Sequence, residues 1–345
     1  MASPPTLRRL GRTAAVLVPL GVVANVALAL LTTDRHVIVA AAELPLAPLA
    51  LAGGLALVPW VTGALRVQLW ASFVGHPVRF LDGLRAVVGG MVGSVVTPTG
   101  SGGGFLKWAL LTRQGLPAGA AGTLLVVEAV ENAAFMAVAL PLALTLTVAA
   151  EAPALRAALA GASDGIVLVV LVAGAVMLGT SLLFAASARG RLGRGPRRLI
   201  ARIRGGLRRP FTDARRVAAL VARRGRLRFA AGFALAAVQW TARYSVAAAL
   251  LAFLGVPVQP VLSWALQWAT FTLMAVVPTP GAAGGAEAAF AALYAPFVPA
   301  DVLGLATAAW RLVLFYAPLS IAAFVFLGLE KMADPPELST SDVPT

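Results

Sequence analysis

The sequence predicts an all-α polytopic membrane protein with about six to eight transmembrane segments, including two re-entrant broken helices, in two inverted-topology repeats. Three observations predict this fold. Hydrophobic residues make up 59% of the 345 residues and charged residues 12%, with a mean hydropathy of +0.87, whereas an average soluble domain is about 25% charged. The apolar residues form runs long enough to cross a bilayer. Two of these runs end in similar Pro/Gly-rich breaks.

The apolar runs predict the order of the spans. The first, residues 14–31, is long enough to favour an uncleaved span over a signal peptide. The other runs, in chain order, are 47–64 (followed by Arg66), 86–96, 117–149, 165–187, 229–254, 261–277 and 302–328. Run 86–96 is too short to cross, since a span needs about 20 residues. The polar tail, residues 329–345, is expected to be disordered.

Most of the net charge of +14 lies in one loop. Residues 189–228 carry fifteen of the 28 Lys and Arg residues and one acid, Asp213. Positive residues beside spans stay in the cytoplasm, so we predict a cytoplasmic loop, with both termini cytoplasmic, in the cytoplasmic (inner) membrane. The loop either determines topology alone or also contacts anionic lipid headgroups. Nucleic-acid binding is not expected, because the loop has one aromatic residue, Phe211, and no recognition motif.

An internal repeat places the two breaks in equivalent positions. "SFVGHPV" (72–78) matches "AFLGVPV" (252–258), and "VVTPTGSGGG" (95–104) matches "VVPTPGAAGG" (276–285), at offsets of 180 and 181. We therefore expect one integral membrane domain, residues 1–328, with repeat one at about 47–149 and repeat two at about 229–328. With a cytoplasmic N-terminus, span 47–64 and its equivalent 229–254 cross in opposite directions, an architecture that recurs in secondary transporters.

The breaks have two interpretations. Irregular backbone at membrane depth is tolerated only where it is buried in protein or lines a watery cavity. Helices that begin after Gly104 and Gly285 would point free N–H groups into such a cavity, which suits a phosphate. Alternatively, Pro and Gly only allow helices to pack closely.

Charged residues within the apolar runs are the second indication of a site. An ionised residue at mid-membrane costs roughly 2.5–3.5 kcal/mol, so it is retained for pairing or for function. Glu128 and Glu131 lie three residues apart, on one helix face. Arg311 occupies nearly the position of Glu128 in the second repeat. The two form an ion pair between the halves, or they serve headgroup binding or proton-coupled transport.

Other polar residues leave more than one role open. Glu287 follows the second break and either caps a helix or contacts a ligand. Lys107, after the first break, either holds a phosphate or reaches the membrane interface. Arg243 is expected to face protein or a cavity. Arg66 and Arg113 lie near the ends of spans and are expected to mark the interface.

Metal, cofactor and enzyme functions find little support. The chain has no cysteine and two distant histidines, His36 and His76, so no metal site or cofactor is expected. It also lacks a Gly-x4-Gly-Lys-Ser/Thr motif for ATP. No convincing nucleophile–base set is present, although the three intramembrane glutamates could act as acids or bases. We therefore do not expect an enzyme.

The segment "VVPTPGAAGGAE" (276–287) and the later "WRLVLFYAPL" (310–319) resemble the second half of the flippase-like family. This family comprises the transmembrane (flippase) domain of lysylphosphatidylglycerol synthases and its stand-alone relatives. In the first half, "VVTPTGSGGGFLKWALLTRQGLP" (95–117) and "VVEAVENAAF" (126–135) are similar to its Pro-x-x-Gly segment and its Glu-containing span. The resemblance covers residues 66–327. The first break is unusually Gly-rich, and Ala129 stands where the family often has an arginine.

The resemblance implies a stand-alone lipid flippase or translocase that moves a phospholipid headgroup through a cavity between the repeats. The alternative is a secondary transporter of a small anionic or amphiphilic solute. Phospholipids are the expected partners, and a homo-oligomer is left open. A chain that ends at Thr345 is expected to make no aminoacylated lipid, because a soluble transferase domain would not fit. Glu131 and Arg243 are added for their intramembrane position. The expected substrate-binding residues are then Pro98, Gly100, Lys107, Glu128, Glu131, Arg243, Pro280, Gly281, Glu287 and Arg311.

Overall fold

Every regular element in the described part of the chain is a helix. The computed structural model describes residues 19–97 (without 20, 28, 32 and 34), 102–161, 224–257, 259–275, 277, 279 and 281–322. The all-α class is therefore confirmed for this part of the chain. The basic loop up to residue 223, the run 165–187 and the tail lie outside it.

The first half contains the helical segment Gly21–Leu31 and five further helices in the described part of the chain. Helix α2 (Arg35–Ala42) precedes α3 (Ala47–Phe73), α4 (Phe80–Val96), α5 (Gly102–Arg113) and α6 (Ala118–Gly161). The predicted end of the second span is wrong. Helix α3 runs nine residues beyond Ala64, because Arg66 is buried against protein instead of ending the helix at the membrane surface.

The second half repeats this order of elements. It contains α9 (Arg226–Phe253), α10 (Pro260–Met274), α11 (Gly285–Tyr294) and α12 (Ala300–Arg311), which continues through a π-helical turn, η1 (Leu312–Tyr316), to residue 322. Equivalent helices begin at nearly constant offsets: 180 residues for α4 and α10, 183 for α5 and α11, and 182 for α6 and α12.

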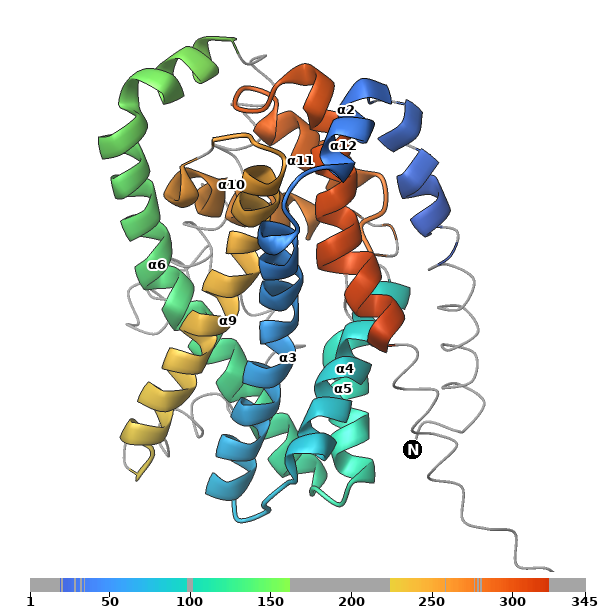
Figure 1. Cartoon of the computed structure of the whole chain (residues 1–345). Coiled ribbons are helices and arrows are strands. Elements are labelled where there is room, and N and C mark those ends of the chain that lie inside the picture. Colours follow the sequence, from blue (N-terminus) through green and yellow to red (C-terminus); the bar gives the residue numbers. More distant parts are fainter. Residues whose placement is uncertain are drawn as a thin grey trace, which may run out of the picture.

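Equivalent helices of the two halves also run in opposite directions. Figure 1 shows α3 descending and α9 ascending beside it, with the α4–α5 pair and the α10–α11 pair at opposite ends of the molecule. The two helices pack along their lengths: Ala52 and Ala56 share a core with Leu250, and at the other end the Arg228 guanidinium lies 5.0 Å from the Phe73 ring. This path agrees with an inverted repeat, which stays a prediction.

Close backbone contact explains the glycines around the first break. Helices α4 and α5 form a tight pair. A Cβ added to Gly93 would lie 2.8 Å from the Gly102 carbonyl oxygen, and one added to Gly103 would lie 2.8 Å from the Gly90 carbonyl oxygen. No side chain fits there, so these glycines let the two helices touch, as small residues do in membrane proteins. The packing interpretation therefore holds for them.

The second break is a turn built on left-handed backbone. Gly281, Ala282 and Gly284 have φ values of +61°, +54° and +79°. Glycine adopts this region without a steric penalty. Helix α11 then begins at Gly285, and the Glu287 carboxylate accepts a hydrogen bond from the Gly284 N–H at 2.8 Å. Glu287 is therefore a helix cap, one of the two roles expected for it.

Three described helices are long and apolar enough to cross a membrane: Ala47–Phe73, Ala118–Leu146 and Ala300–Ala322. A fourth candidate is the pair Gly21–Leu31 and Arg35–Ala41, which is bent by 113°. The structure thus supports a membrane protein. The predicted six to eight segments and the re-entrant path of the broken helices stay predictions.

Candidate functional site

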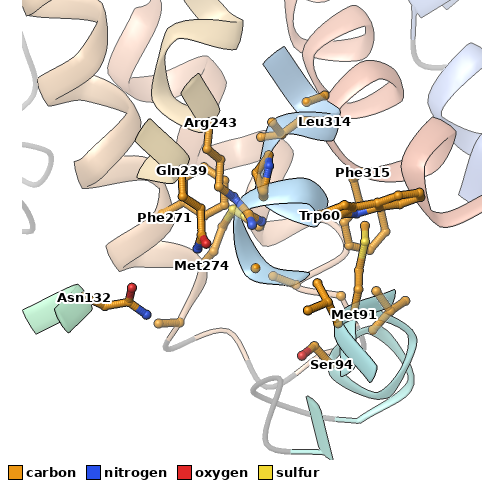
Figure 2. A pocket seen from close by; sticks show the side chains of 18 of the residues that line it. Trp60, Met91, Ser94, Asn132, Gln239, Arg243, Phe271, Met274, Leu314 and Phe315 are labelled. Atoms are coloured by element: carbon orange, nitrogen blue, oxygen red, sulfur yellow. The ribbon is translucent and has the colours of Figure 1, made fainter. Parts of the chain in front are cut away.

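A cavity of about 410 Å³ lies between the two halves. Its wall mixes polar and apolar side chains. Figure 2 shows Gln239 with Phe271 and Met274 on one side of the view, and Trp60 with Met91 and Ser94 on the other. The volume falls within the range of about 300–1,000 Å³ found for small-molecule sites, and the wall suits a ligand that is partly polar and partly apolar.

Arg66, in the cavity wall, joins α3 to α6 and α9. Its side chain is 2% exposed, and its Nη2 lies 2.7 Å from the Glu131 carboxylate, which is fully buried. Its Nη1 donates to Asn132 Oδ1 at 3.0 Å and to Gln239 Oε1 at 3.4 Å. The other Glu131 oxygen accepts from Trp70 Nε1 at 2.7 Å. A guanidinium with five donors in a planar fork is suited to such a junction.

The expectation that Arg66 marks the interface is wrong. The apolar run stops at this residue in the sequence, but the carboxylate that pairs with it comes from α6, 65 residues later. The cost of burying both charges is offset by their attraction and by hydrogen bonds that satisfy the remaining polar atoms. Glu131, expected to bind substrate, is instead enclosed by Arg66 and Trp70 and has no exposed surface.

A second ion pair closes one side of the cavity. Lys107 on α5 lies 2.6 Å from one Glu128 oxygen and 2.8 Å from the other. Both side chains line the cavity, and each is about one-eighth exposed, at 12% and 13%. The cavity thus receives a matched positive and negative charge from these two residues.

A third ion pair lies in the second half, with its polarity reversed. Arg311 on α12 lies 2.9 Å from Glu287 on α11, although its Nε is not aligned for a hydrogen bond. Its Nη2 donates to the Gly281 carbonyl at 2.5 Å, and its guanidinium lies 3.9 Å from the Phe315 ring centroid. Glu287 and Arg311 occupy the positions of Lys107 and Glu128 in the repeat. The alternative in which Glu128 pairs with Arg311 is therefore not found, because each pairs within its own half.

Arg243 differs from the other three cations in the cavity wall. No carboxylate in the described part of the chain pairs with it, and its buried Nε has no hydrogen-bond partner there. The guanidinium lies 4.8 Å from the Phe271 ring centroid and 5.9 Å from that of Trp240. Figure 2 shows the side chain reaching into the cavity from α9. The expectation that Arg243 faces protein or a cavity is confirmed.

The structure brings together five of the ten expected site residues in the cavity wall: Lys107, Glu128, Arg243, Gly281 and Arg311. Glu131 and Glu287 lie behind it, each bound to an arginine of the wall. Pro98, Gly100 and Pro280 lie outside the described residues. Whether any of these residues binds substrate stays a prediction.

Sequence analysis missed Arg66, Asn132 and Gln239 as residues of this wall. A usable signal existed for two of them. Asn132 directly follows Glu131, and Gln239 lies four residues before Arg243, on the same face of α9. Polar residues inside membrane helices face the protein interior by default, so helical spacing alone could have placed both beside the predicted charges.

Comparisons with known proteins agree with this architecture. Residues 13–322 match the family model described as the lysylphosphatidylglycerol synthase TM region. The chain is also similar to a UPF0104 membrane protein of Archaeoglobus fulgidus, with 22% identity over 276 residues, which cover 76% of this chain and 81% of the relative. The family match spans both halves and every lining residue of the cavity.

Proposed function

The chain belongs to the family of the lysylphosphatidylglycerol synthase transmembrane region, and on that premise we propose that it is a stand-alone lipid translocase. In this proposal, the headgroup of a phospholipid passes through the cavity between the two halves. The protein lies in the cytoplasmic membrane with both termini in the cytoplasm. The basic loop 189–228 then faces the anionic lipid of the inner leaflet.

One observation carries the proposal: a cavity lined by both polar and apolar side chains lies between the two halves. A phospholipid also combines polar and apolar groups. Asn132, Gln239 and Arg243 offer hydrogen bonds to a headgroup, and Trp60 and Phe315 offer packing to the start of an acyl chain. The volume of about 410 Å³ fits a headgroup and leaves the chains in the bilayer.

The charge balance of the wall also favours a phosphate. Three of its cations are matched by carboxylates: Arg66 by Glu131, Lys107 by Glu128 and Arg311 by Glu287. Arg243 adds one positive charge without a described acidic partner. In a medium of low dielectric constant this charge attracts an anion strongly. A small anionic solute would share that attraction, but it would leave the apolar lining residues unused.

Lipid movement in liposomes tests the function. Fluorescent phospholipids of several headgroups are placed in both leaflets, and external dithionite quenches the label that reaches the outer leaflet. We expect the protein to remove the protected inner-leaflet signal. Arg243→Gln should slow this loss about tenfold, because a charged hydrogen bond contributes roughly 1.5–3 kcal/mol.

Arg113→Gln is the matched control, since it removes the same charge from an exposed residue at the end of α5, outside the cavity. It should translocate lipid like wild type. A folded protein that moves no labelled lipid, but carries a phosphorylated solute into lipid-only liposomes, would replace the translocase with the solute transporter.

A further inference from the structure

We propose that Arg243, Asn132 and Gln239 form an oxyanion site for a phosphate group, and that Arg66 is the positioning residue that orients the two amides toward it. The inference deepens the translocase proposal and rests on it only for the role of the site in transport. The ligand class is a deprotonated phosphate ester or free phosphate that presents only acceptors. The three side chains come from two helices, α6 and α9.

Arg66 determines which end of each amide faces the cavity. Its Nη1 donates to Asn132 Oδ1 and to Gln239 Oε1. The Asn132 oxygen has a second donor as well, Trp240 Nε1 at 3.1 Å. Thr62 Oγ1 lies 3.4 Å from Gln239 Oε1, but its one proton is shared with the nearer Val58 carbonyl at 3.0 Å, so Arg66 is the donor that orients Gln239. The reverse orientation would place an NH2 group against these donors, so each oxygen faces Arg66.

The amide nitrogens are therefore the groups that remain for a ligand. Asn132 and Gln239 both line the cavity. Neither Asn132 Nδ2 nor Gln239 Nε2 has a hydrogen-bond partner in the described part of the chain, and neither is among its buried unpaired atoms. Each amide can donate two hydrogen bonds. Both nitrogens thus remain accessible as donors in the cavity wall.

Arg243 adds the charge. Gln239 and Arg243 are four residues apart on α9, so they share a helix face. Trp240 links Arg243 to Asn132, because its ring lies 5.9 Å from the Arg243 guanidinium and its Nε1 donates to Asn132. The Phe271 ring, 4.8 Å from the guanidinium centre, supports one face of the group. Arginine supported in this way uses its planar fork to hold phosphate oxygens.

The same wall disfavours a cationic group. Glu128 is the one carboxylate among the lining residues that the structure describes, and Lys107 binds both of its oxygens. An ammonium group placed among Arg243 and the two amides would meet donors only. Specificity arises when buried donors would be left unpaired by the wrong ligand. The site therefore selects for phosphate and does not require a positive charge on the headgroup.

Binding to purified protein in detergent tests the site without any transport step. Titration calorimetry with dihexanoyl phosphatidylglycerol, inorganic phosphate and uncharged dihexanoylglycerol compares the three ligands. Phosphatidylglycerol should bind at least about tenfold tighter than dihexanoylglycerol, the difference expected for one charged hydrogen bond. Inorganic phosphate that binds and displaces the lipid would identify phosphate itself as sufficient. Phosphate that does neither, while phosphatidylglycerol binds, would assign the site to lipid.

Gln239→Glu is the sharpest variant, because it keeps the acceptor for Arg66 and replaces the free donor with a carboxylate oxygen. It should weaken phosphatidylglycerol binding by about tenfold to a hundredfold. Gln259→Glu is the matched control: this exposed residue precedes α10, outside the cavity, and the variant should bind like wild type. If Gln239→Glu does not fold, Arg243→Gln and Arg243→Lys replace it: affinity should fall in both, and further in Arg243→Gln, because lysine keeps the positive charge but not the planar fork.

Arg66→Lys tests the positioning role. A lysine keeps a positive charge beside Glu131 but loses the donor that the two amides share. The affinity for phosphatidylglycerol should fall while that for dihexanoylglycerol stays unchanged, so the ratio of the two affinities drops. A purely structural residue would lower both equally.

Two outcomes separate this inference from the translocase proposal. Unchanged phosphatidylglycerol affinity in Gln239→Glu or Arg243→Gln, or equally tight binding of dihexanoylglycerol, would overturn the oxyanion site even if lipid moves in liposomes. Binding as expected, together with no movement of any lipid, would retain the site and remove the translocase.

Discussion

At the scale of single residues, Arg66 shows how a membrane helix can carry a charge at depth. Its guanidinium is almost fully buried, yet each of its three nitrogens has an acceptor on α6 or α9. A buried pair is costly to assemble, but removing one partner leaves the other charge buried and unpaired. The ion pair between Arg66 and Glu131 should therefore stabilise the fold only while both partners are present.

Arg66→Met should lower the free energy of unfolding by about 3–5 kcal/mol, the cost typical of breaking a buried ion pair. The double variant Arg66→Met with Glu131→Gln should lose less, because it removes both charges and keeps an acceptor for Trp70. Unfolding in mixed micelles of mild detergent and SDS, followed by tryptophan fluorescence, measures both. A double variant no more stable than Arg66→Met would mean that the unpaired charge is not the cause.

At the scale of elements, the two Pro/Gly breaks resemble each other in sequence but use glycine differently. Around the first break, glycine provides close approach, because the α4 and α5 backbones touch at Gly93 and Gly103. In the second, glycine provides left-handed backbone at Gly281 and Gly284. The equivalent residues Gly103 and Gly284 thus answer two different steric demands, which composition alone does not separate.

Neighbouring glycines on α5 offer a matched test of the close approach. A Cβ on Gly103 would collide with the Ser94 side chain and the Gly90 carbonyl, whereas one on Gly104 meets nothing within 4 Å. Gly103→Ala should therefore cost about 1–3 kcal/mol, as overpacking does. Gly104→Ala should be neutral or stabilising by up to about 1 kcal/mol, because alanine has the higher helix propensity.

Thermal unfolding of the two purified variants, compared with wild type, checks this expectation. Both variants replace a glycine with an alanine in the same helix, so the gain in helix propensity is the same in each. The difference in stability between them therefore reports the steric clash at Gly103. Equal stability of Gly103→Ala and Gly104→Ala would contradict the tight α4–α5 contact.

At the scale of the whole molecule, the two halves carry mirrored ion pairs. Lys107 with Glu128 and Glu287 with Arg311 join equivalent helices, with the cation and the anion exchanged. Each of these two pairs therefore lies within one half, and neither connects the two halves. Movement of one half against the other would leave both pairs intact, which suits an alternating exposure of the cavity between them.

Cysteine labelling tests the opposite orientation of the halves, since the chain has no native cysteine to react. Ser72→Cys at the end of α3 and Leu227→Cys at the start of α9 should react with an impermeant maleimide from the cytoplasmic face. Leu46→Cys and Ala252→Cys, at the other ends of the same helices, should react only from the opposite face. Labelling of Ser72→Cys and Leu227→Cys from different faces would rule out the antiparallel crossing and the inverted repeat.

The sequence by itself determined the all-α membrane class and the approximate positions of most of the longer described helices. The high mean hydropathy and the low fraction of charged residues require lipid as the solvent. The two short repeated motifs place equivalent helices about 180 residues apart. These features are local, since they depend on composition and spacing along one segment of chain. The intramembrane residues Glu128, Arg243 and Arg311 were recognisable for the same reason, because a charge inside an apolar run is visible without a partner.

Only the tertiary structure decided which charges are paired and which remain free. Arg66 looked like the end of a span until Glu131 was placed beside it, and the pairs of Glu128 and Arg311 form with Lys107 and Glu287 instead of with each other. The free amide groups of Asn132 and Gln239 depend on the same contacts. Ion pairing and amide orientation are set by distances of about 3 Å between helices far apart in the chain, and the spacing of residues along a single helix does not contain them.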